Sequence, residues 1–407
     1  MPSIVEKKLS SLDFWAKSPT ERGELFAELR ATREPVFCPL HDGSGFYALT
    51  RYDQVAEVSR NPQAFSSEPT AVSPVDPPPQ ITRYSGSMIS MDDPRHARLR
   101  RIVSRSFTPR LIERVTGDVA SLARRIVDEL SQRGPCDFVE HVATPMPLRI
   151  ICSMMGIPES EYGDVIDATN VILAVGDPDY VDADGKNRQA LLAEKFSYLH
   201  KLMADLGRLR REQPADDLVT ALTRANVDGE ALDDQDLGRF FALLVIAGNE
   251  TTRNALSHAL ALLTEHPVQR ELLLADLDGH LPGAVEEIVR YATPVTWMRR
   301  TLSRDYELQG HTYRAGDRVI LYYNSANRDE TVFDDANTFD ITRSPNPHVG
   351  FGAPGPHFCL GAHLARREVT VMLRELFTRL PNLHATDTPV RQRASFINGI
   401  RSLPCAF

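Results

Sequence analysis

The 407-residue sequence lacks a long hydrophobic run, a close pair of cysteines and an excess of positive charge. Residues 1–15 alternate polar and apolar types, which is not typical of a signal peptide or a membrane anchor. The five cysteines are scattered: Cys38, Cys136, Cys152, Cys359 and Cys405. This pattern argues against a disulfide framework or a zinc site and fits a reducing cytoplasm. Since the net charge is −9, general nucleic-acid binding is also not expected. We expect a soluble cytoplasmic protein without a membrane or nucleic-acid partner.

The composition and the periodicity predict a helix-rich globular protein. The sequence is 42% hydrophobic and 25% charged, which excludes disordered and fibrous classes. Helical periodicity predicts helices over 109–133, 139–155, 159–175, 187–212, 216–226, 234–266, 267–277 and 281–292. Short strand patterns predict a small sheet made of hairpins from 35–38, 45–50, 306–309, 312–313 and 318–323. The fold class is therefore mainly α with a small β region.

Two segments interrupt these patterns. Residues 68–79 are rich in proline and cannot form a helix, so they are either a linker or an ordered loop. We favour the loop, because the patterns on both sides belong to one core. The polar segment 176–185 separates two helices. We expect one domain over 1–407, with a β-rich part at about 35–50 and 306–323 plus the C-terminal segment.

Cys359 lies in a turn-rich loop that leads directly into helix-forming sequence. In an arbitrary protein, one cysteine in such a loop is usually a small buried apolar residue. Here the glycines let backbone N–H groups approach the sulfur, and the start of the helix places a positive dipole end beside it. Both effects favour the thiolate. A single thiolate held in this way is a suitable ligand for haem iron.

The predicted helix 234–266 is apolar nearly all round, which indicates a path through the interior. Its centre nevertheless holds Gly248, Glu250 and Thr251. On a purely structural interpretation, Thr251 bonds to a carbonyl one turn earlier and Glu250 forms a salt bridge. Gly248 favours a functional interpretation, because glycine inside a helix costs about 1 kcal/mol relative to alanine. Its missing side chain lets a flat ligand or a small gas molecule approach.

Together these segments resemble the cytochrome P450 monooxygenases of the soluble bacterial type. Phe351, Gly355, His357 and Cys359 match the haem-binding loop of that family in order, and 247–252 is similar to its oxygen-activation motif. The phenylalanine stands eight residues before the cysteine, where the common form has seven. Some bacterial members that act on branched lipids and sterols share this longer loop. The resemblance extends over nearly the whole chain.

The resemblance implies a cytochrome P450 fold, with haem b between the long central helix and the cysteine loop. Cys359 would be the axial thiolate, and Phe351 and Gly248 would lie beside the cofactor. Glu250 would belong to a proton delivery path, and Thr251 would bond the iron-bound dioxygen. Electrons would come from a separate protein, because the match of 350–355 to G-x-G-x-x-G follows no clear strand and is rejected as a dinucleotide site.

Basic residues provide candidates for binding the haem propionates, which guanidinium and imidazolium groups hold best. The candidates are His96, Arg100, Arg300 and His357, with Arg299 as the alternative to Arg300.

Three further residues match a structural motif of the family. Glu287 and Arg290 share a helix face, and most such pairs are solvated surface contacts. With Arg343, the resemblance instead implies a buried triad behind the cysteine loop that serves folding and haem retention.

Apolar residues beside these motifs are candidates for the substrate pocket, and plain core packing is an equal alternative for each. They are Met88, Ile89, Leu243, Leu244, Ala247, Val295, Met298, Phe396 and Ile397. They indicate a mainly apolar small molecule: a branched lipid, a terpenoid, a steroid-like compound or a secondary-metabolite intermediate. The expected reaction inserts one oxygen atom from O2 into a C–H bond. The alternatives are a peroxide-driven, dehydratase or isomerase haem-thiolate enzyme and a non-catalytic haem sensor.

Surplus arginines form a cationic concentration on this acidic protein, namely Arg98, Arg101, Arg105, Arg366 and Arg367. We expect an acidic ferredoxin-type electron donor to dock there, with plain solvation as the alternative.

Overall fold

The computed structural model describes residues 9–32, 34–77, 86–173, 188–227 and 230–407. The α-helices in these ranges are α1 (Leu12–Trp15), α2 (Pro19–Ala31), α3 (Tyr52–Arg60), α5 (Arg95–Ser106), α6 (Pro109–Arg133), α7 (Pro145–Met155), α8 (Tyr162–Leu173), α9 (Arg188–Glu212), α10 (Leu218–Arg224), α11 (Asp234–Glu265), α12 (Pro267–Ala275), α13 (Leu277–Ala292), α14 (Tyr323–Ala326) and α15 (Ala362–Arg379). The 3-10 helices are η1 (Met88–Ser90) and η3 (Glu159–Glu161), and η2 (Val139–Ala143) is a π-helix.

The strands in the same ranges are short. They are β1 (Val36–Pro39), β2 (Gly45–Leu49), β3 (Phe65–Ser66), β4 (Cys136–Asp137), β5 (Asn226–Val227), β6 (Glu230–Ala231), β7 (Trp297–Leu302), β8 (Tyr306–Leu308), β9 (His311–Tyr313), β10 (Arg318–Tyr322), β11 (His384–Ala385), β12 (Val390–Arg391), β13 (Ile400–Ser402) and β14 (Pro404–Ala406).

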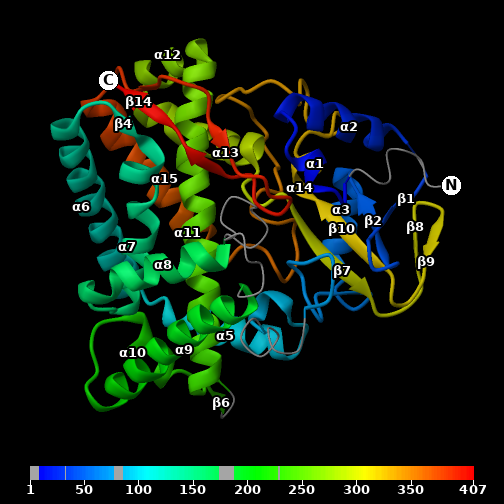
Figure 1. Cartoon of the computed structure of the whole chain (residues 1–407), viewed down its shortest axis with the longest axis horizontal. Coiled ribbons are helices and arrows are strands. Elements are labelled where there is room, and N and C mark those ends of the chain that lie inside the picture. Colours follow the sequence, from blue (N-terminus) through cyan, green and yellow to red (C-terminus); the bar gives the residue numbers. More distant parts are fainter. Residues whose placement is uncertain (1–8, 33, 78–85, 174–187, 228–229) are drawn as a thin grey trace.

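Helix α11 is the axis of the helical half of the molecule (Figure 1). The side chain of Asp233 caps it by accepting a hydrogen bond from the backbone N–H of Asp236, and the acidic first turn suits the helix dipole. Helices α7, α8, α9, α13 and α15 pack around it. This packing explains the apolar segments of α11 on both sides of its polar centre.

The main sheet lies at the other side of the molecule, beneath α1 and α2 in Figure 1. Its strand order is β1-β2-β10-β7-β3. Strand β10 runs parallel to β2 and antiparallel to β7. The expectation of a sheet built only from hairpins is therefore wrong, because parallel strands need a long crossover that local turn patterns do not reveal.

The observed helices agree with the expected ones most closely where they are long. The expected helix 139–155 is divided into the π-helix η2 and α7, which has Pro145 at its first position. Helix α13 begins at Leu277, earlier than expected, and Pro282 falls inside it. Capping of α13 by Asp276, which accepts from the backbone N–H of Gly279, sets this earlier start.

The described part of the proline-rich segment, 68–77, packs against the sheet. Asp76 forms an ion pair with Arg299 at 2.7 Å, and the backbone N–H of Arg299 donates to the carbonyl of Ala71 at 2.9 Å. These contacts support the ordered loop over the linker. Residues 78–79 and the predicted break at 176–185 lie outside the described residues. Within the described ranges, no helix is both long enough and apolar enough to cross a membrane.

Candidate active site

The loop that ends at Cys359 is held tightly between neighbouring elements. The backbone N–H of Cys359 donates to the carbonyl of Phe351 at 2.9 Å, which closes the loop. A Cβ at Gly355 would lie 2.2 Å from the carbonyl oxygen of Ser59 at the end of α3, so only glycine fits this contact. Gly361 then caps α15 two residues beyond the cysteine. The position of the sulfur is therefore set by backbone contacts.

The protonation of Cys359 differs from our expectation. Burial raises the pKa of the Cys359 thiol above its ordinary value. The backbone N–H of Gly361 and the cations Arg100 and Arg366 lower it again, by less. In the chain alone these effects together oppose the thiolate, contrary to the expected direction, although the Cys359 residue is exposed. A bound haem iron would stabilise the thiolate, because a metal ion deprotonates a thiol that coordinates it.

One stripe of the buried helix α11 is left accessible. Ala247 is exposed, and Leu243 and Thr251, one turn before and after it, are partly exposed. Leu244, Ile246 and Gly248 are partly exposed as well, whereas Val245 is 0% and Asn249 1% exposed. An accessible stripe on an interior helix is typical of a helix that lines a ligand site.

Gly248 lies where α11 packs against α7. A Cβ at Gly248 would lie 2.9 Å from Cδ1 of Ile151 on α7. That atom is the end of a flexible side chain, so the packing of α7 against α11 is only a weak reason for glycine here. The place of Gly248 beside the cofactor stays a prediction.

Glu250 and Thr251 show the contacts that the structural interpretation predicts. Thr251 Oγ1 donates to the carbonyl of Ala247 at 2.6 Å. Glu250 is 2% exposed, and its Oε1 accepts from Arg253 and, at 2.9 Å, from Asn254 Nδ2. Its Oε2, however, is buried without a hydrogen-bond partner among the described residues. An unpartnered buried carboxylate oxygen is costly, so it is a candidate for proton exchange.

Arg299 and Arg300 have clearly different surroundings because they project from opposite faces of β7. Arg299 pairs with Asp76 and donates to the carbonyls of Ser73 and Pro74. Arg300 is 6% exposed and donates to the carbonyl of Arg299 at 2.7 Å. Burial lowers the pKa of Arg300. Of the two, Arg300 is therefore the one available for an anionic ligand.

Two stacked histidines lie beside Arg300. The rings of His96 and His357 are 4.1 Å apart, and His357 Nε2 is 3.0 Å from the hydroxyl of Ser67. Burial, reinforced by Arg300, lowers the pKa of His357 to about 3. Burial also lowers the pKa of His96, whose Nε2 is buried without a partner. Both shifts favour the neutral imidazole in the chain itself, which leaves arginine as the source of positive charge here.

The donor set fits the two propionates of haem b. Arg100 Nη2 reaches the loop and donates to the carbonyl of Phe358 at 2.5 Å. Within the described residues, no carboxylate lies at ion-pair distance from Arg100 or Arg300. Two buried or half-buried guanidinium groups without a counter-charge, with an unpartnered His96 nitrogen near them, are suited to an anionic ligand with two carboxylates.

Two members of the expected triad are completely buried, and the third, Arg343, is partly buried. Glu287 and Arg290 are each 0% exposed and form two hydrogen bonds of 2.7 Å. Arg343 Nε is 3.4 Å from the same carboxylate. Arg290 also donates to the carbonyl of Asn327, whose side chain accepts from the backbone N–H of Val349 at the start of the cysteine loop. This contact connects the triad to the loop.

The pocket candidates do not all share one environment. Met88 lines a small apolar pocket between η1, α5 and the start of α11. Phe396 packs edge-on against Trp297 at 5.0 Å, as a core residue does. Val295 pairs with Ile397 in an isolated β-bridge. The remaining candidates are partly buried: Ile89, Leu244 and Met298.

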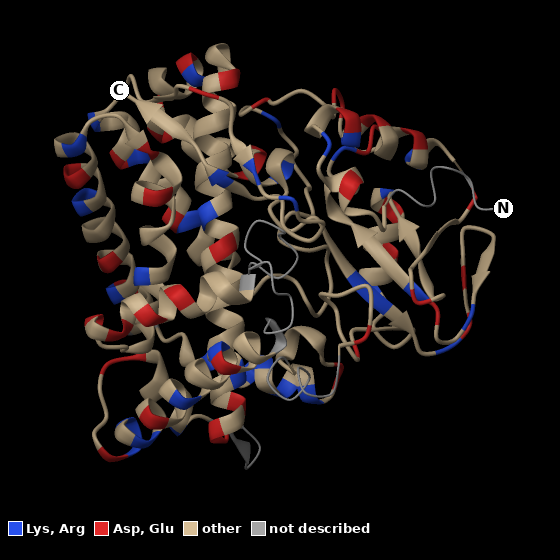
Figure 2. Cartoon of the chain, viewed as in Figure 1, with Lys and Arg blue, Asp and Glu red and all other residues tan. Residues whose placement is uncertain are grey.

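The structure removes Arg366 from the unpaired charges of the proposed basic face. Arg366 Nε donates to Glu286 at 2.6 Å, and its guanidinium covers the ring of Phe351 at 4.3 Å. Arg366 is therefore a support of the cysteine loop and presents no unpaired charge. Basic residues along α5 remain visible in Figure 2, and Arg105 and Arg367 are exposed.

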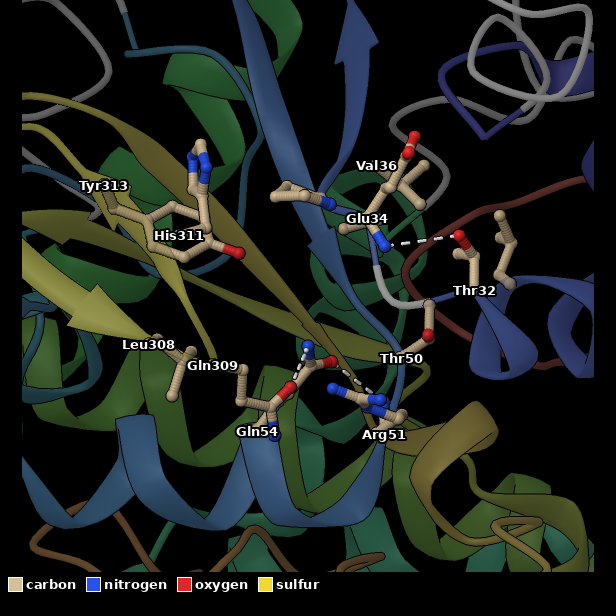
Figure 3. Close-up of a pocket in the computed structure, with 13 residues that line it drawn as sticks. Thr32, Glu34, Val36, Thr50, Arg51, Gln54, Leu308, Gln309, His311 and Tyr313 are labelled. Carbon is tan, nitrogen blue, oxygen red and sulfur yellow. Dashed lines mark hydrogen bonds between the residues drawn. The ribbon is translucent and has the colours of Figure 1, made fainter.

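A separate polar pocket lies between α2, β1, α3 and the β8–β9 hairpin (Figure 3). Gln54 Nε2 donates to Gln309 at 2.9 Å across it. Arg51, His311 and Tyr313 also line it. None of its lining residues belongs to the constellation around Cys359, so we do not assign the reaction to this pocket.

Sequence reasoning missed the residues that hold Glu250. Arg253 and Asn254 follow it by three and four positions on the same helix face, and this spacing was a readable signal. Gln392 Nε2 donates to the same Oε1 at 3.3 Å from 142 positions away, and no sequence pattern indicates it.

Comparisons with known proteins agree with this geometry. The family model for cytochrome P450 matches residues 13–395. The chain is 46% identical to a methyl-branched lipid omega-hydroxylase of Mycobacterium tuberculosis, over 98% of this chain and 94% of the relative. It is 40% identical to a steroid C26-monooxygenase of the same species, over 89% of this chain and 82% of the relative.

A solved structure extends the agreement to three dimensions. The structure of a Mycobacterium marinum cytochrome P450 in complex with pseudoionone superposes with a TM-score of 0.92 at 43% identity, covering 98% of each chain. The chain therefore belongs to the cytochrome P450 family, the monooxygenases that hold haem through a cysteine thiolate, which is Cys359 here.

Proposed function

We propose that this monooxygenase hydroxylates the terminal carbon of a branched alkyl chain in a lipid or a steroid. Its similarity to a lipid omega-hydroxylase and to a steroid C26-monooxygenase supports the proposal, because both names denote oxidation at a chain end. The observation that carries it is the accessible stripe of α11. Leu243 and Ala247 lie on it directly before Thr251. An apolar chain end that follows this stripe reaches the hydroxyl of Thr251.

The residues of the site have separable roles in this proposal. Cys359 holds the iron, and Arg100 and Arg300 bind the propionates. The bound haem supplies the activation of O2 and the oxidation of the C–H bond. Glu250 Oε2 exchanges a proton, and Thr251 Oγ1 directs it toward the oxygen-binding side. Because the α-rich and β-rich parts both contribute to this site, we propose that they act as one domain.

The substrate proposal is tested by the position of oxidation. The haem-loaded enzyme, with a ferredoxin and its reductase, is given a methyl-branched fatty acid, an unbranched acid of equal length and a steroid with its full side chain. We expect terminal alcohols from the branched acid or the steroid, and less turnover of the unbranched acid. Oxidation confined to internal or ring carbons, identified by mass spectrometry, would contradict the proposal.

The role of Thr251 is tested by following the electrons. In Thr251→Ala we expect most of the electrons to form hydrogen peroxide while substrate binding stays unchanged. Thr252→Ala is the matched control, because Thr252 is buried and lies off the accessible stripe. A peroxide-driven enzyme would instead keep its activity in Thr251→Ala when peroxide replaces the electron donor.

A ferredoxin-type donor is proposed to dock on the exposed arginines of α5 and α15. Acidic donors are steered by positive charge, and the attraction weakens with salt. We expect Arg105→Glu and Arg367→Glu to weaken ferredoxin binding at low salt. Arg314→Glu, which removes an exposed arginine near the β8–β9 hairpin, is the charge-matched control. Equal binding by all three variants would count against this surface.

A further inference from the structure

Two amide side chains connect the buried Glu250 to the hairpin of β12 and β13. Gln392 Nε2 donates to Glu250 Oε1 at 3.3 Å, and Asn254 Nδ2 donates to the same oxygen at 2.9 Å. Asn254 Oδ1 accepts from the backbone N–H of Ile400 at 2.9 Å. Arg253 adds an ion pair to the same oxygen. Glu250 Oε1 therefore has three donors, whereas Oε2 has none among the described residues.

The loop between Gln392 and Gly399 is held as one unit. The backbone N–H of Gln392 donates to the carbonyl of Gly399 at 3.0 Å, and that of Asn398 donates to the carbonyl of Pro294 at 2.9 Å. The loop carries Ile397, a candidate for the substrate pocket. A substrate that displaces this loop will therefore also displace Gln392.

The three donors to Glu250 differ in where they are attached. Arg253 and Asn254 are on α11 and move with Glu250, since they lie one turn along the same helix. Gln392 alone reaches Oε1 from another element. Asn254 also links Glu250 to the C-terminal segment, through Ile400. Gln392 differs from it because Gln392 is itself part of the pocket loop and contacts the carboxylate directly.

We propose that Gln392 is a positioning residue that couples substrate binding at the 392–399 loop to proton delivery by Glu250. Its amide occupies Oε1 and leaves Oε2 as the oxygen that exchanges the proton. The inference rests on the proposed relay role of Glu250 and deepens it. It explains why an amide from the C-terminal segment donates to a carboxylate in the middle of α11.

Gly399 offers a way to move Gln392 without altering Glu250. A Cβ at Gly399 would lie 2.0 Å from Gln392 Oε1 and 2.5 Å from its Cδ. The φ angle of Gly399 lies outside the left-handed range, so the backbone accepts alanine. Gly399→Ala should therefore push the Gln392 amide away from the carboxylate.

The test compares Gln392→Leu, Gln392→Ala, Gly399→Ala and the combination of Gly399→Ala with Gln392→Ala. Arg393→Gln, which changes an exposed residue on the same loop, is the matched control. The first measurement is the infrared band of the Glu250 carboxyl group in the resting protein, assigned by its loss in Glu250→Gln. The second is the share of electrons that end in hydrogen peroxide at saturating substrate.

We expect both Gln392→Leu and Gly399→Ala to shift the carboxyl band and to raise peroxide formation several-fold. The double variant should match Gln392→Ala alone, because alanine at 392 lacks the amide atoms that the new Cβ at 399 would meet. If Glu250→Gln itself leaves the electron balance unchanged, the relay role fails and this inference falls with it. If Glu250→Gln uncouples the reaction but neither Gln392→Leu nor Gly399→Ala shifts the band or the balance, only the inference is overturned.

An independent observation concerns Cys136 and Cys405. The register of β4 and β14 places them directly opposite each other, although they are far apart in the sequence. Opposed residues of an antiparallel pair have Cα atoms about 4.5–5.5 Å apart, which is within the range for disulfides. Both thiols are free, and burial raises the pKa of each. The fold thus brings together two cysteines that are far apart in the sequence.

We propose that this pair is a site of oxidative modification by hydrogen peroxide. Peroxide oxidises the half-buried Cys136 sulfur to a sulfenic acid, and one water is released. The thiol of the buried Cys405 then attacks that sulfur, the S–S bond forms, and a second water leaves. Two thiols and one peroxide thus become one disulfide and two waters.

The test is peptide mass spectrometry of the haem-loaded protein after peroxide treatment and alkylation of free thiols. We expect a cross-linked peptide that contains Cys136 and Cys405. Cys38 and Cys152 are 0% exposed, so peroxide should not reach them and both should be alkylated once the protein is denatured. In Cys405→Ser, a sulfenic acid trap should instead label Cys136. Complete alkylation of both cysteines after treatment, or overoxidation of Cys136 without the cross-link, would overturn the proposal.

Discussion

The buried carboxylate of Glu287 allows a quantitative prediction. In Glu287→Ala, Arg290 loses both of its 2.7 Å hydrogen bonds to a carboxylate while it remains 0% exposed. Breaking a buried ion pair by removing one partner costs about 3–5 kcal/mol. The backbone N–H of Asp340, which donates to Glu287 at 2.9 Å, also loses its acceptor, which costs about 1–3 kcal/mol. We therefore expect a loss of about 5 kcal/mol, comparable to the whole stability of many proteins.

The neighbouring Glu286 provides the control for this prediction. Its side chain is 30% exposed and pairs with Arg366, which is 31% exposed. It also accepts from His348 Nε2 at 3.0 Å. Although burial raises the pKa of Glu286, its hydrogen bonds with Arg366 and His348 lower it to about 2. Losing a hydrogen bond to a charged group costs about 1.5–3 kcal/mol, which is less than the loss expected for Glu287→Ala. Urea unfolding followed by circular dichroism measures both variants, and Glu287→Gln, which keeps an acceptor oxygen, should lie between them. A loss in Glu287→Ala no larger than that in Glu286→Ala would refute the reasoning.

Three further predictions follow from the described contacts. Arg300→Leu should speed the transfer of haem to apomyoglobin by about tenfold, since one charge-assisted hydrogen bond contributes about 1.5–3 kcal/mol. Arg299→Leu should instead retain haem and weaken the attachment of the 71–76 loop. Burial raises the pKa of Glu368 from 4.5 to about 8, so between these pH values the folded state binds more protons than the unfolded state. The free energy of unfolding should therefore fall by about 1.4 kcal/mol for each pH unit as the pH rises through this range. Glu368→Gln should remove this slope in urea titrations between pH 5 and 8. Gly248→Ala should cost less stability when combined with Ile151→Val than the sum of the two single changes, because the valine removes the atom that the new Cβ meets.

The sequence predicted the features that depend on local pattern. The long helix α11 begins where expected and ends within one residue of the expectation, because its apolar run has an acidic cap at one end and Pro267 just beyond the other. The cytochrome P450 family and fold were likewise recognisable from the cysteine loop and the 247–252 motif, and the comparisons confirm them.

Features that depend on contacts between distant segments were not predictable in the same way. Strand β7 was missed because its six residues include two arginines, which do not form an apolar alternation. The pairing of β7 with β10, together with the loop at Asp76, determines that Arg299 forms the ion pair and that Arg300 does not. The thiol pKa of Cys359 was predicted in the wrong direction, because burial by the folded chain outweighs the local dipole.

The alternation along β7 limits which sequence changes the protein tolerates. Arg299 and Arg300 have the same side chain, but adjacent residues of a strand point to opposite faces of the sheet. For this reason Arg299 forms an ion pair with Asp76, whereas Arg300 lies beside His357. Inserting or deleting one residue between Thr293 and Arg299 could shift the register of the strand by one position. The two arginines would then exchange environments, although the composition of the site would hardly change. We therefore expect this segment to evolve by substitution, because a change in its length would turn the arginine side chain to the wrong face of the sheet.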